Sequence, residues 1–277
     1  MDYAARLEEL SIQYDRFPVL QDVTVDFPTG KTTVIIGPSG CGKSTLMKAA
    51  AGLIPPSHGH AELLGYDLSR IGDRDLRTLR RRNGFVFQDA ALWQNLTVSQ
   101  NLALPIEHHN PGMTAGEVSR RIEPLLDDIG FVGQRDLRPS QLSAGERKII
   151  SFVRALVSEP DILFLDEPTT FVDTEVSERM LRKMKAIREQ GKTMLLVTHN
   201  PEITAQLADY VLVLKKGRVL LFGTLADVVH AADPEVRSIL SDVLSEAATY
   251  DTDILSLLDK DSDPFPDMSN DDRQDEI

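Results

Sequence analysis

The feature that most constrains the fold is a glycine-rich stretch between an apolar run and a helical pattern. Residues 32–36 are apolar or β-branched, and apolar residues recur at helical spacing from about Lys43 onward. A strand, a tight loop and a helix in this order begin an α/β domain. Glycines let successive backbone N–H groups turn inward around an anion, and the following helix points its positive end at the same place. The sequence therefore predicts a phosphate-binding loop made of Gly37, Pro38, Ser39, Gly40, Cys41, Gly42, Lys43, Ser44 and Thr45.

This loop fits the P-loop pattern, in which a glycine and four further residues precede Gly-Lys-Ser or Gly-Lys-Thr. In that pattern Lys43 contacts the β- and γ-phosphates of a nucleoside triphosphate, and the Ser44 hydroxyl coordinates Mg²⁺. Cys41 is interpreted as a small neutral residue of the loop, and a redox role has little support. A glycine-rich turn that contains a lysine by chance is the alternative, and the flanking strand and helix argue against it.

A second apolar run, residues 162–165, is followed by Asp166 and Glu167. In an open α/β sheet, ligands bind at the carboxyl ends of the strands. Asp166 is therefore expected to hold Mg²⁺, and Glu167, one residue further on, is expected to polarise the water that attacks the γ-phosphate. A strand that simply ends in two surface acids is the alternative, and the P-loop upstream argues against it.

Between these two motifs lies Leu142-Ser143-Ala144-Gly145-Glu146, and with it the chain resembles the ATP-binding-cassette (ABC) family, whose signature is Leu-Ser-Gly-Gly-Gln. The resemblance covers about residues 5–225 and implies ATP with Mg²⁺ as ligands. Further matches follow in the family's order: Tyr14 as the adenine-stacking aromatic, Gln88 as the metal-contacting glutamine, Asp173 after the acidic pair, and His199 as the γ-phosphate-contacting histidine.

The resemblance also implies a two-chain site, in which Ser143 and Gly145 face the P-loop of a second subunit. One P-loop and one signature are present, so a second copy of the chain is the simplest partner. Two departures from the signature, Ala144 and Glu146, predict slower hydrolysis rather than none. Residues 169–173, which include Phe171, are bulkier than the small residues common at this place in the family, and this is expected to affect how closely two subunits pack.

Several of these residues have a plainer interpretation. Tyr14 is also compatible with an ordinary strand aromatic, Gln88 with a solvated polar residue, and His199 with a helix cap. Trp93 fits either the core or a groove for a membrane partner. The arginines between residues 70 and 82 suit a solvated helix face better than a lipid or partner contact.

The whole pattern predicts an α/β fold: a P-loop NTPase core with an antiparallel β subdomain, a helical insertion, a C-terminal helical extension and an acidic tail. The expected boundaries are 5–225 for the ABC domain, with the helical part at about 95–158, then 226–258 for the extension and 259–277 for a disordered tail. The net charge of -13 is concentrated at the end, where residues 251–277 hold ten acidic and two basic side chains. No basic surface dominates, so nucleic acid is not an expected partner.

Segments at residues 87–105 and 232–237 resemble ATPases of the Mla/MCE type, which move lipid or hydrophobic solutes across the bacterial envelope. That resemblance implies phospholipid transport, an integral membrane permease, an MCE-type lipid-binding protein, and a peripheral position on the cytoplasmic face of the inner membrane. The single cysteine and the lack of a signal-like N-terminus fit a cytoplasmic location. A transport ATPase for an amino acid, peptide or drug stays open, as does, less favoured, a soluble ABC ATPase.

Overall fold

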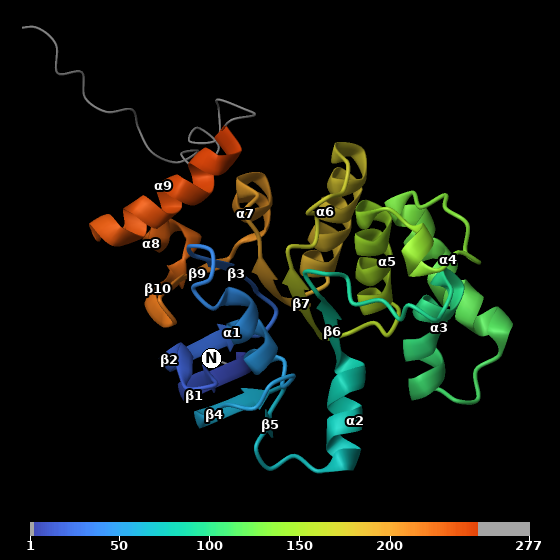
Figure 1. Cartoon of the computed structure of the whole chain (residues 1–277), viewed down its shortest axis with the longest axis horizontal. Helices are drawn as coiled ribbons and strands as arrows, with labels where there is room; N and C mark the ends of the chain where they lie inside the picture. The colour runs from blue at the N-terminus through green and yellow to red at the C-terminus, as the bar shows by residue number, and fades with distance from the viewer. Residues whose placement is uncertain (1–2, 249–277) are drawn as a thin grey trace, which may run out of the picture.

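The computed structural model describes residues 3–248, and side chains as far as residue 241. Strands form two sheets, one mainly parallel and one antiparallel, and helices pack around them (Figure 1). The predicted α/β cassette fold is confirmed. The expected tail at 259–277 and the end of the expected extension, from residue 249, lie outside the described residues.

The six-stranded sheet has the order β10-β9-β3-β8-β7-β6, and only the β9–β10 pair is antiparallel. Every residue of β3, β7 and β8 is buried, as expected for parallel strands covered on both faces. The bounds are β3 Thr32–Ile36, β6 Asn83–Val86, β7 Ile162–Asp166, β8 Thr193–Val197, β9 Tyr210–Lys215 and β10 Arg218–Thr224.

The antiparallel sheet has the order β2-β1-β4-β5, from β1 (Tyr3–Tyr14), β2 (Phe17–Pro28), β4 (His58–Leu63) and β5 (Tyr66–Asp67). The alternation in residues 5–27 predicts the first two of these strands, which are confirmed as an antiparallel pair. The strand pair β4–β5 was not predicted, because His58, Gly59 and His60 give it no apolar alternation. A backbone hydrogen bond from Gln21 N to Gly217 O, 2.9 Å long, joins the two sheets.

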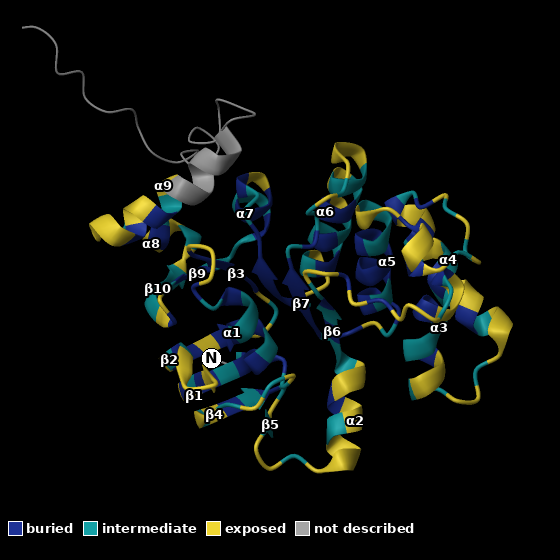
Figure 2. Ribbon diagram, in the orientation of Figure 1, coloured by how far each residue is buried: buried dark blue, intermediate teal, exposed yellow. Residues whose placement is uncertain are grey.

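The helices are α1 Lys43–Ala50, α2 Asp73–Arg82, α3 Val98–His109, α4 Ala115–Ile129, α5 Ala144–Leu156, α6 Thr174–Glu189, α7 Pro201–Leu207, α8 Leu225–Val229 and α9 Pro234–Ala248. Helices α3, α4 and α5 gather at one end of the molecule, away from the antiparallel sheet (Figure 1). The outer faces of α3 and α4 are exposed, whereas α5 and the central strands are largely buried (Figure 2). No helix within residues 3–248 is both long and apolar enough to cross a membrane.

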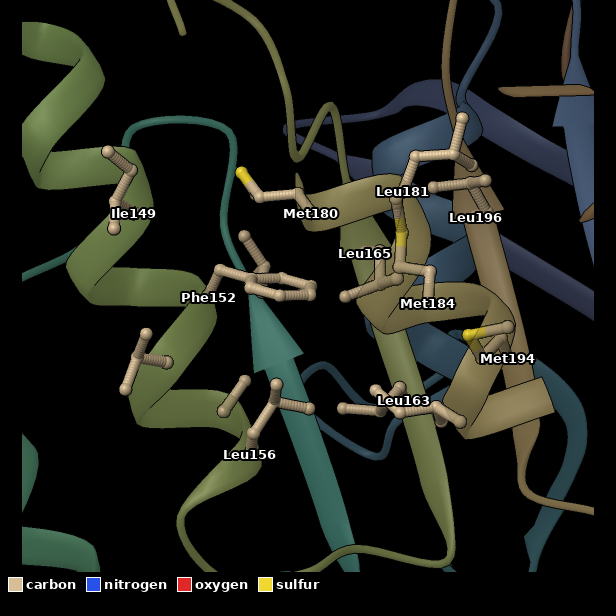
Figure 3. Packing of buried hydrophobic residues seen from close by; sticks show 14 of the residues in the cluster. Ile149, Phe152, Leu156, Leu163, Leu165, Met180, Leu181, Met184, Met194 and Leu196 are labelled. Carbon is tan, nitrogen blue, oxygen red and sulfur yellow. The ribbon is translucent and has the colours of Figure 1, made fainter. Parts of the chain in front are cut away.

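One hydrophobic cluster joins the helical part to the parallel sheet. Phe152 of α5 is fully buried between that helix, β7 and α6, and its ring points toward Leu165 and Met180 (Figure 3). Burying an aromatic or aliphatic side chain of this size contributes about 1.5–3 kcal/mol. The cluster therefore fixes α5 firmly against the strand that carries the acidic pair.

Candidate functional site

Four parallel strands end at one edge of the six-stranded sheet, and each is followed by a predicted site residue. In the register, Val86 is paired with Leu165, Asp166 with Val197, and Val197 with Ile35. The P-loop follows β3, Gln88 follows β6, the acidic pair ends β7, and His199 follows β8. Parallel pairing thus collects residues from four distant parts of the sequence.

The P-loop depends on glycines at two crowded positions. Gly37 has φ of 154°, and a Cβ there would lie 2.1 Å from the carbonyl oxygen of Leu214. Gly42, the residue before α1, has φ of 109°, and its Cβ would meet Leu20 at 2.9 Å. Any other residue at these positions would push the loop away from β2 and β9.

Lys43 lies folded over the loop that precedes it. It is 9% exposed, and its ammonium donates hydrogen bonds to the carbonyl oxygens of Gly37, at 2.7 Å, and Pro38, at 3.1 Å. The positive charge is therefore held within the loop, where it can interact with a bound phosphate.

Asp166 is the last residue of β7 and is 2% exposed. Burial raises the pKa of its carboxyl, while the Ser44 hydroxyl and the cations Lys48, Lys148 and Lys43 act in the opposite direction. Its Oδ1 atom has no hydrogen-bond partner among the described residues. A buried carboxylate oxygen without a hydrogen-bond partner is costly, and such an oxygen is suited to bind a cation.

Glu167 leaves the strand in a left-handed conformation, with φ of 50°. Its N–H still donates to Val197 O at 2.9 Å, but its side chain is directed to β8, where Oε1 lies 3.4 Å from Nε2 of His199. Thr170 donates a hydrogen bond of 3.2 Å to the other carboxylate oxygen. Burial raises the pKa of Glu167, whereas His199 and Thr170 oppose that rise and Asp166 adds to it. A positive φ at a non-glycine residue stores strain that often marks a functional position.

These side chains line one pocket of about 350 Å³, a size within the range of small-molecule sites. The predicted residues that line it are Ser39, Gly40, Gly42, Lys43, Ser44, Thr45, Gln88, Asp166, Glu167 and His199. Gly37 and Pro38 border it through their contacts with Lys43, and Cys41 is buried behind it, where burial raises the pKa of its thiol.

Four predicted residues, Tyr14, Ser143, Gly145 and Asp173, lie away from this pocket. Tyr14 is 49% exposed at the end of β1, beside the turn into β2. Ser143 caps α5, where its hydroxyl accepts from Glu146 N, and Gly145 lies in the first turn against the backbone of Phe171. Asp173, likewise, caps α6 by accepting from Val176 N. One chain alone does not bring Ser143 and Gly145 to its own P-loop.

Four residues of the site were not identified from the sequence. Val19 lines the pocket from β2 and Val197 from the end of β8, Thr170 binds Glu167, and Lys148 donates from α5 to the loop that carries Gln88. Val19 and Thr170 carry no distinctive pattern. Lys148 had a signal, because it lies on the buried side of an amphipathic helix next to Ile149 and Ile150.

The residues present fit a magnesium ion that is shared with phosphates. Within the described residues, no group of three or more His, Cys, Asp or Glu side chains could hold a metal ion by itself. Ser44, Gln88 and Asp166 do line one pocket and offer hydroxyl, amide and carboxylate oxygens. Mg²⁺ commonly binds one or two protein ligands plus substrate phosphates and water, which is the type of donor set found here.

A P-loop, a strand-end acidic pair and a histidine at one sheet edge define a P-loop nucleoside triphosphatase. The profile of the family described as "ABC transporter" matches residues 20–170, more than half of the chain. The chain belongs to the ABC transporter family.

Relatives and solved structures agree with this placement. The chain is 37% identical over 231 residues to methionine import ATP-binding protein MetN 1 of Rhodopseudomonas palustris, covering 83% of this chain and 61% of that protein. It is 36% identical to sulfate/thiosulfate import ATP-binding protein CysA 1 of Agrobacterium fabrum, covering 80% and 64%. The chain thus spans less than two thirds of the length of these two relatives.

The dimeric ATP-binding cassette MJ0796, solved in a post-hydrolysis state with ADP and Pi, superimposes with a TM-score of 0.75. Its sequence is 28% identical, and the match covers 80% of this chain and 98% of the cassette.

Proposed function

We propose that the chain is the ATP-hydrolysing subunit of a membrane transporter and works as a pair. The observation that carries the proposal is the single pocket in which Lys43, Asp166, Glu167 and His199 meet. Its charges and loop geometry suit a triphosphate, and its buried carboxylate suits a base. The membership in the ABC transporter family supports the same activity.

In this proposal the P-loop amides and Lys43 bind the phosphates, and Tyr14 stacks on the adenine. Lys43 exchanges its contacts with Gly37 and Pro38 for contacts with phosphate oxygens. Tyr14 is exposed at the hairpin of the antiparallel sheet, so an aromatic face is accessible for a base. Ser44, Gln88 and Asp166 would hold Mg²⁺, which neutralises phosphate charge when bound.

Glu167 accepts the proton of the attacking water in this proposal. Its carboxylate is held by Thr170 and lies beside His199, which is positioned for the γ-phosphate. The strained backbone of Glu167 and the bond from its N–H to Val197 fix where the carboxylate points. Orientation of this kind is what general base catalysis requires.

The second half of each site comes from another copy of the chain. Ser143 and Gly145 begin a helix, whose N-terminal end favours an anion, yet they lie outside the pocket of their own chain. Two copies related by a two-fold axis would place each signature against the other P-loop. The dimeric cassette that resembles this chain supports the arrangement.

For the substrate, we propose import of a small solute, because the two relatives are import ATP-binding proteins for methionine and for sulfate or thiosulfate. The relatives support the amino-acid type of alternative better than phospholipid transport. Phospholipid transport with an MCE-type protein is the second candidate, and it rests on the Mla/MCE-like segment at residues 87–105. In either case the chain binds an integral permease on the cytoplasmic face of the inner membrane.

The test is to isolate the chain from gently solubilised native membranes and identify what accompanies it. A multi-pass permease of the solute-import type is expected, together with magnesium-dependent ATP hydrolysis. A permease with an MCE-type protein and bound phospholipid would select the second candidate. No membrane protein in the preparation would refute the transport role, and no hydrolysis by the complex would refute the ATPase assignment.

A further inference from the structure

Side chains of helix α5 donate hydrogen bonds to the backbone carbonyls of residues 87–91, called here the glutamine loop. The Lys148 ammonium donates to Gln88 O at 2.7 Å and to Phe87 O at 3.1 Å. The Arg154 guanidinium donates to Ala90 O at 3.0 Å and to Ala91 O at 2.9 Å. Two cations of one helix therefore bind four carbonyls of one short loop.

The loop is bent to make these contacts. Ala90 has φ of 65° and Ala91 has φ of 44°, both in the left-handed region that non-glycine residues seldom adopt. Such a conformation is strained, and it persists only where the surroundings hold it. Hydrogen bonds from charged donors are the stronger kind, so the two contacts with Arg154 offset this strain.

Lys148 is a buried cation on α5 that contacts the backbone of the glutamine loop. It is 2% exposed. Burial lowers the pKa of its ammonium, while the nearby carboxylates Asp166, Glu167 and Asp89 oppose that change. The helix that carries Lys148 is anchored to β7 and α6 by the hydrophobic cluster around Phe152 (Figure 3).

The contact with Lys148 connects two parts of the site. Gln88 lines the pocket, and the orientation of its side chain depends on the backbone that Lys148 holds. Ser143 begins the same helix, five residues before Lys148, which corresponds to about 7.5 Å along the axis. A shift of α5 would therefore move the start of the helix and the backbone of Gln88 together.

We propose that Lys148 is a positioning residue for ATP hydrolysis, which keeps the Gln88 side chain in the pocket and makes its position follow that of α5. The inference rests on the proposed function. Lys148 does not contact the nucleotide in this scheme but acts through Gln88. Through this contact, a movement of the signature helix α5 changes the position of Gln88 in the pocket of the same chain.

The experiment uses the full chain with ATP and Mg²⁺ and the variant Lys148→Met, which keeps the length but removes the charge. We expect kcat to fall about tenfold to a hundredfold, as for other supporting groups behind a reactive centre, with KM for ATP within about twofold. In the absence of nucleotide, the amides of residues 87–91 should exchange hydrogen faster in Lys148→Met than in the wild type. Lys148→Arg should retain more activity, and Lys148→Gln replaces the methionine variant if that one does not fold.

The control is Lys192→Met, which removes a lysine that donates to Asp161 at 2.9 Å, away from the pocket. It should lower stability without changing kcat or the exchange at residues 87–91. The variants Gln88→Ala and Lys148→Met should not be additive, because both remove the same function. An unchanged kcat in folded Lys148→Met, or losses that multiply in the double variant, would overturn the inference alone. A wild-type chain that hydrolyses no ATP would overturn the proposed function beneath it.

Discussion

Glu167 joins a strained backbone to a buried carboxylate, and both bear on hydrolysis. The variant Glu167→Gln keeps the shape and the contact with Thr170 but cannot accept a proton. We expect kcat to fall about 10²–10⁴-fold, the usual contribution of a general base, while ATP still binds. Steady-state hydrolysis and equilibrium binding of ATP measure the two effects. A variant that hydrolyses ATP at the normal rate would remove Glu167 as the base.

The raised pKa of Glu167 also predicts a pH dependence of stability. A carboxyl whose pKa is higher in the folded than in the unfolded protein destabilises the fold once it is ionised. This cost is absent below the ordinary pKa of glutamate and grows as pH rises through the raised value. Without nucleotide and Mg²⁺, Glu167→Gln should therefore melt at a higher temperature than the wild type at pH 7. This difference in melting temperature should shrink as pH falls toward 4. Thermal melts between pH 7 and pH 4 measure it, and a difference that stays constant would contradict burial of the carboxylate as its cause.

At the scale of elements, Gly84 sets how closely β6 approaches α5. A Cβ at this position would lie 2.4 Å from the carbonyl oxygen of Ala155 and 2.7 Å from Leu163. We expect Gly84→Ala to destabilise the fold by about 1–3 kcal/mol, the usual cost of overpacking, because backbone has to move. Gly112→Ala is the matched control, since nothing lies within 4 Å of its Cβ. Equal denaturant midpoints for the two variants would contradict the close approach.

The start of α5 carries a second prediction. Glu146 accepts from the Ser143 N–H at 2.8 Å, so the signature serine and the glutamate form a reciprocal cap. A carboxylate here adds negative charge where the phosphates of a partner's ATP would dock. Glu146→Gln preserves the cap geometry and removes the charge, so we expect hydrolysis to rise a few-fold with unchanged thermal stability. A rate equal to or below that of the wild type would argue against charge repulsion at this position.

At the scale of the whole molecule, the pocket of one chain lacks the signature. ATP bound to the P-loop should therefore draw two copies together, most clearly where hydrolysis is blocked. We expect Glu167→Gln to sediment as a dimer with ATP and Mg²⁺ and as a monomer without nucleotide. Adding Lys43→Met to this variant should abolish the dimer by weakening phosphate binding. A dimer that forms equally with and without nucleotide would contradict a site shared between two chains.

Short local patterns were enough to predict much of this protein. A glycine-rich loop between strand and helix admits few conformations, so residues 37–45 and the apolar strands of the parallel sheet could be identified from the sequence. The pairing of Asp166 and Glu167 with that loop followed from a general property of parallel sheets, namely that their carboxyl ends lie together.

The rest depended on contacts between residues far apart in the chain. The strands β4 and β5 lack apolar alternation; β4 forms along the edge of β1, and β5 in turn pairs with β4. Lys148 reads as one polar residue in a helix, and only packing against β7 and α6 turns it toward the glutamine loop. The sequence determined which groups are proposed to bind phosphate, because that requirement is local. The tertiary structure decided what holds those groups in place, because burial and carbonyl contacts depend on how distant elements pack.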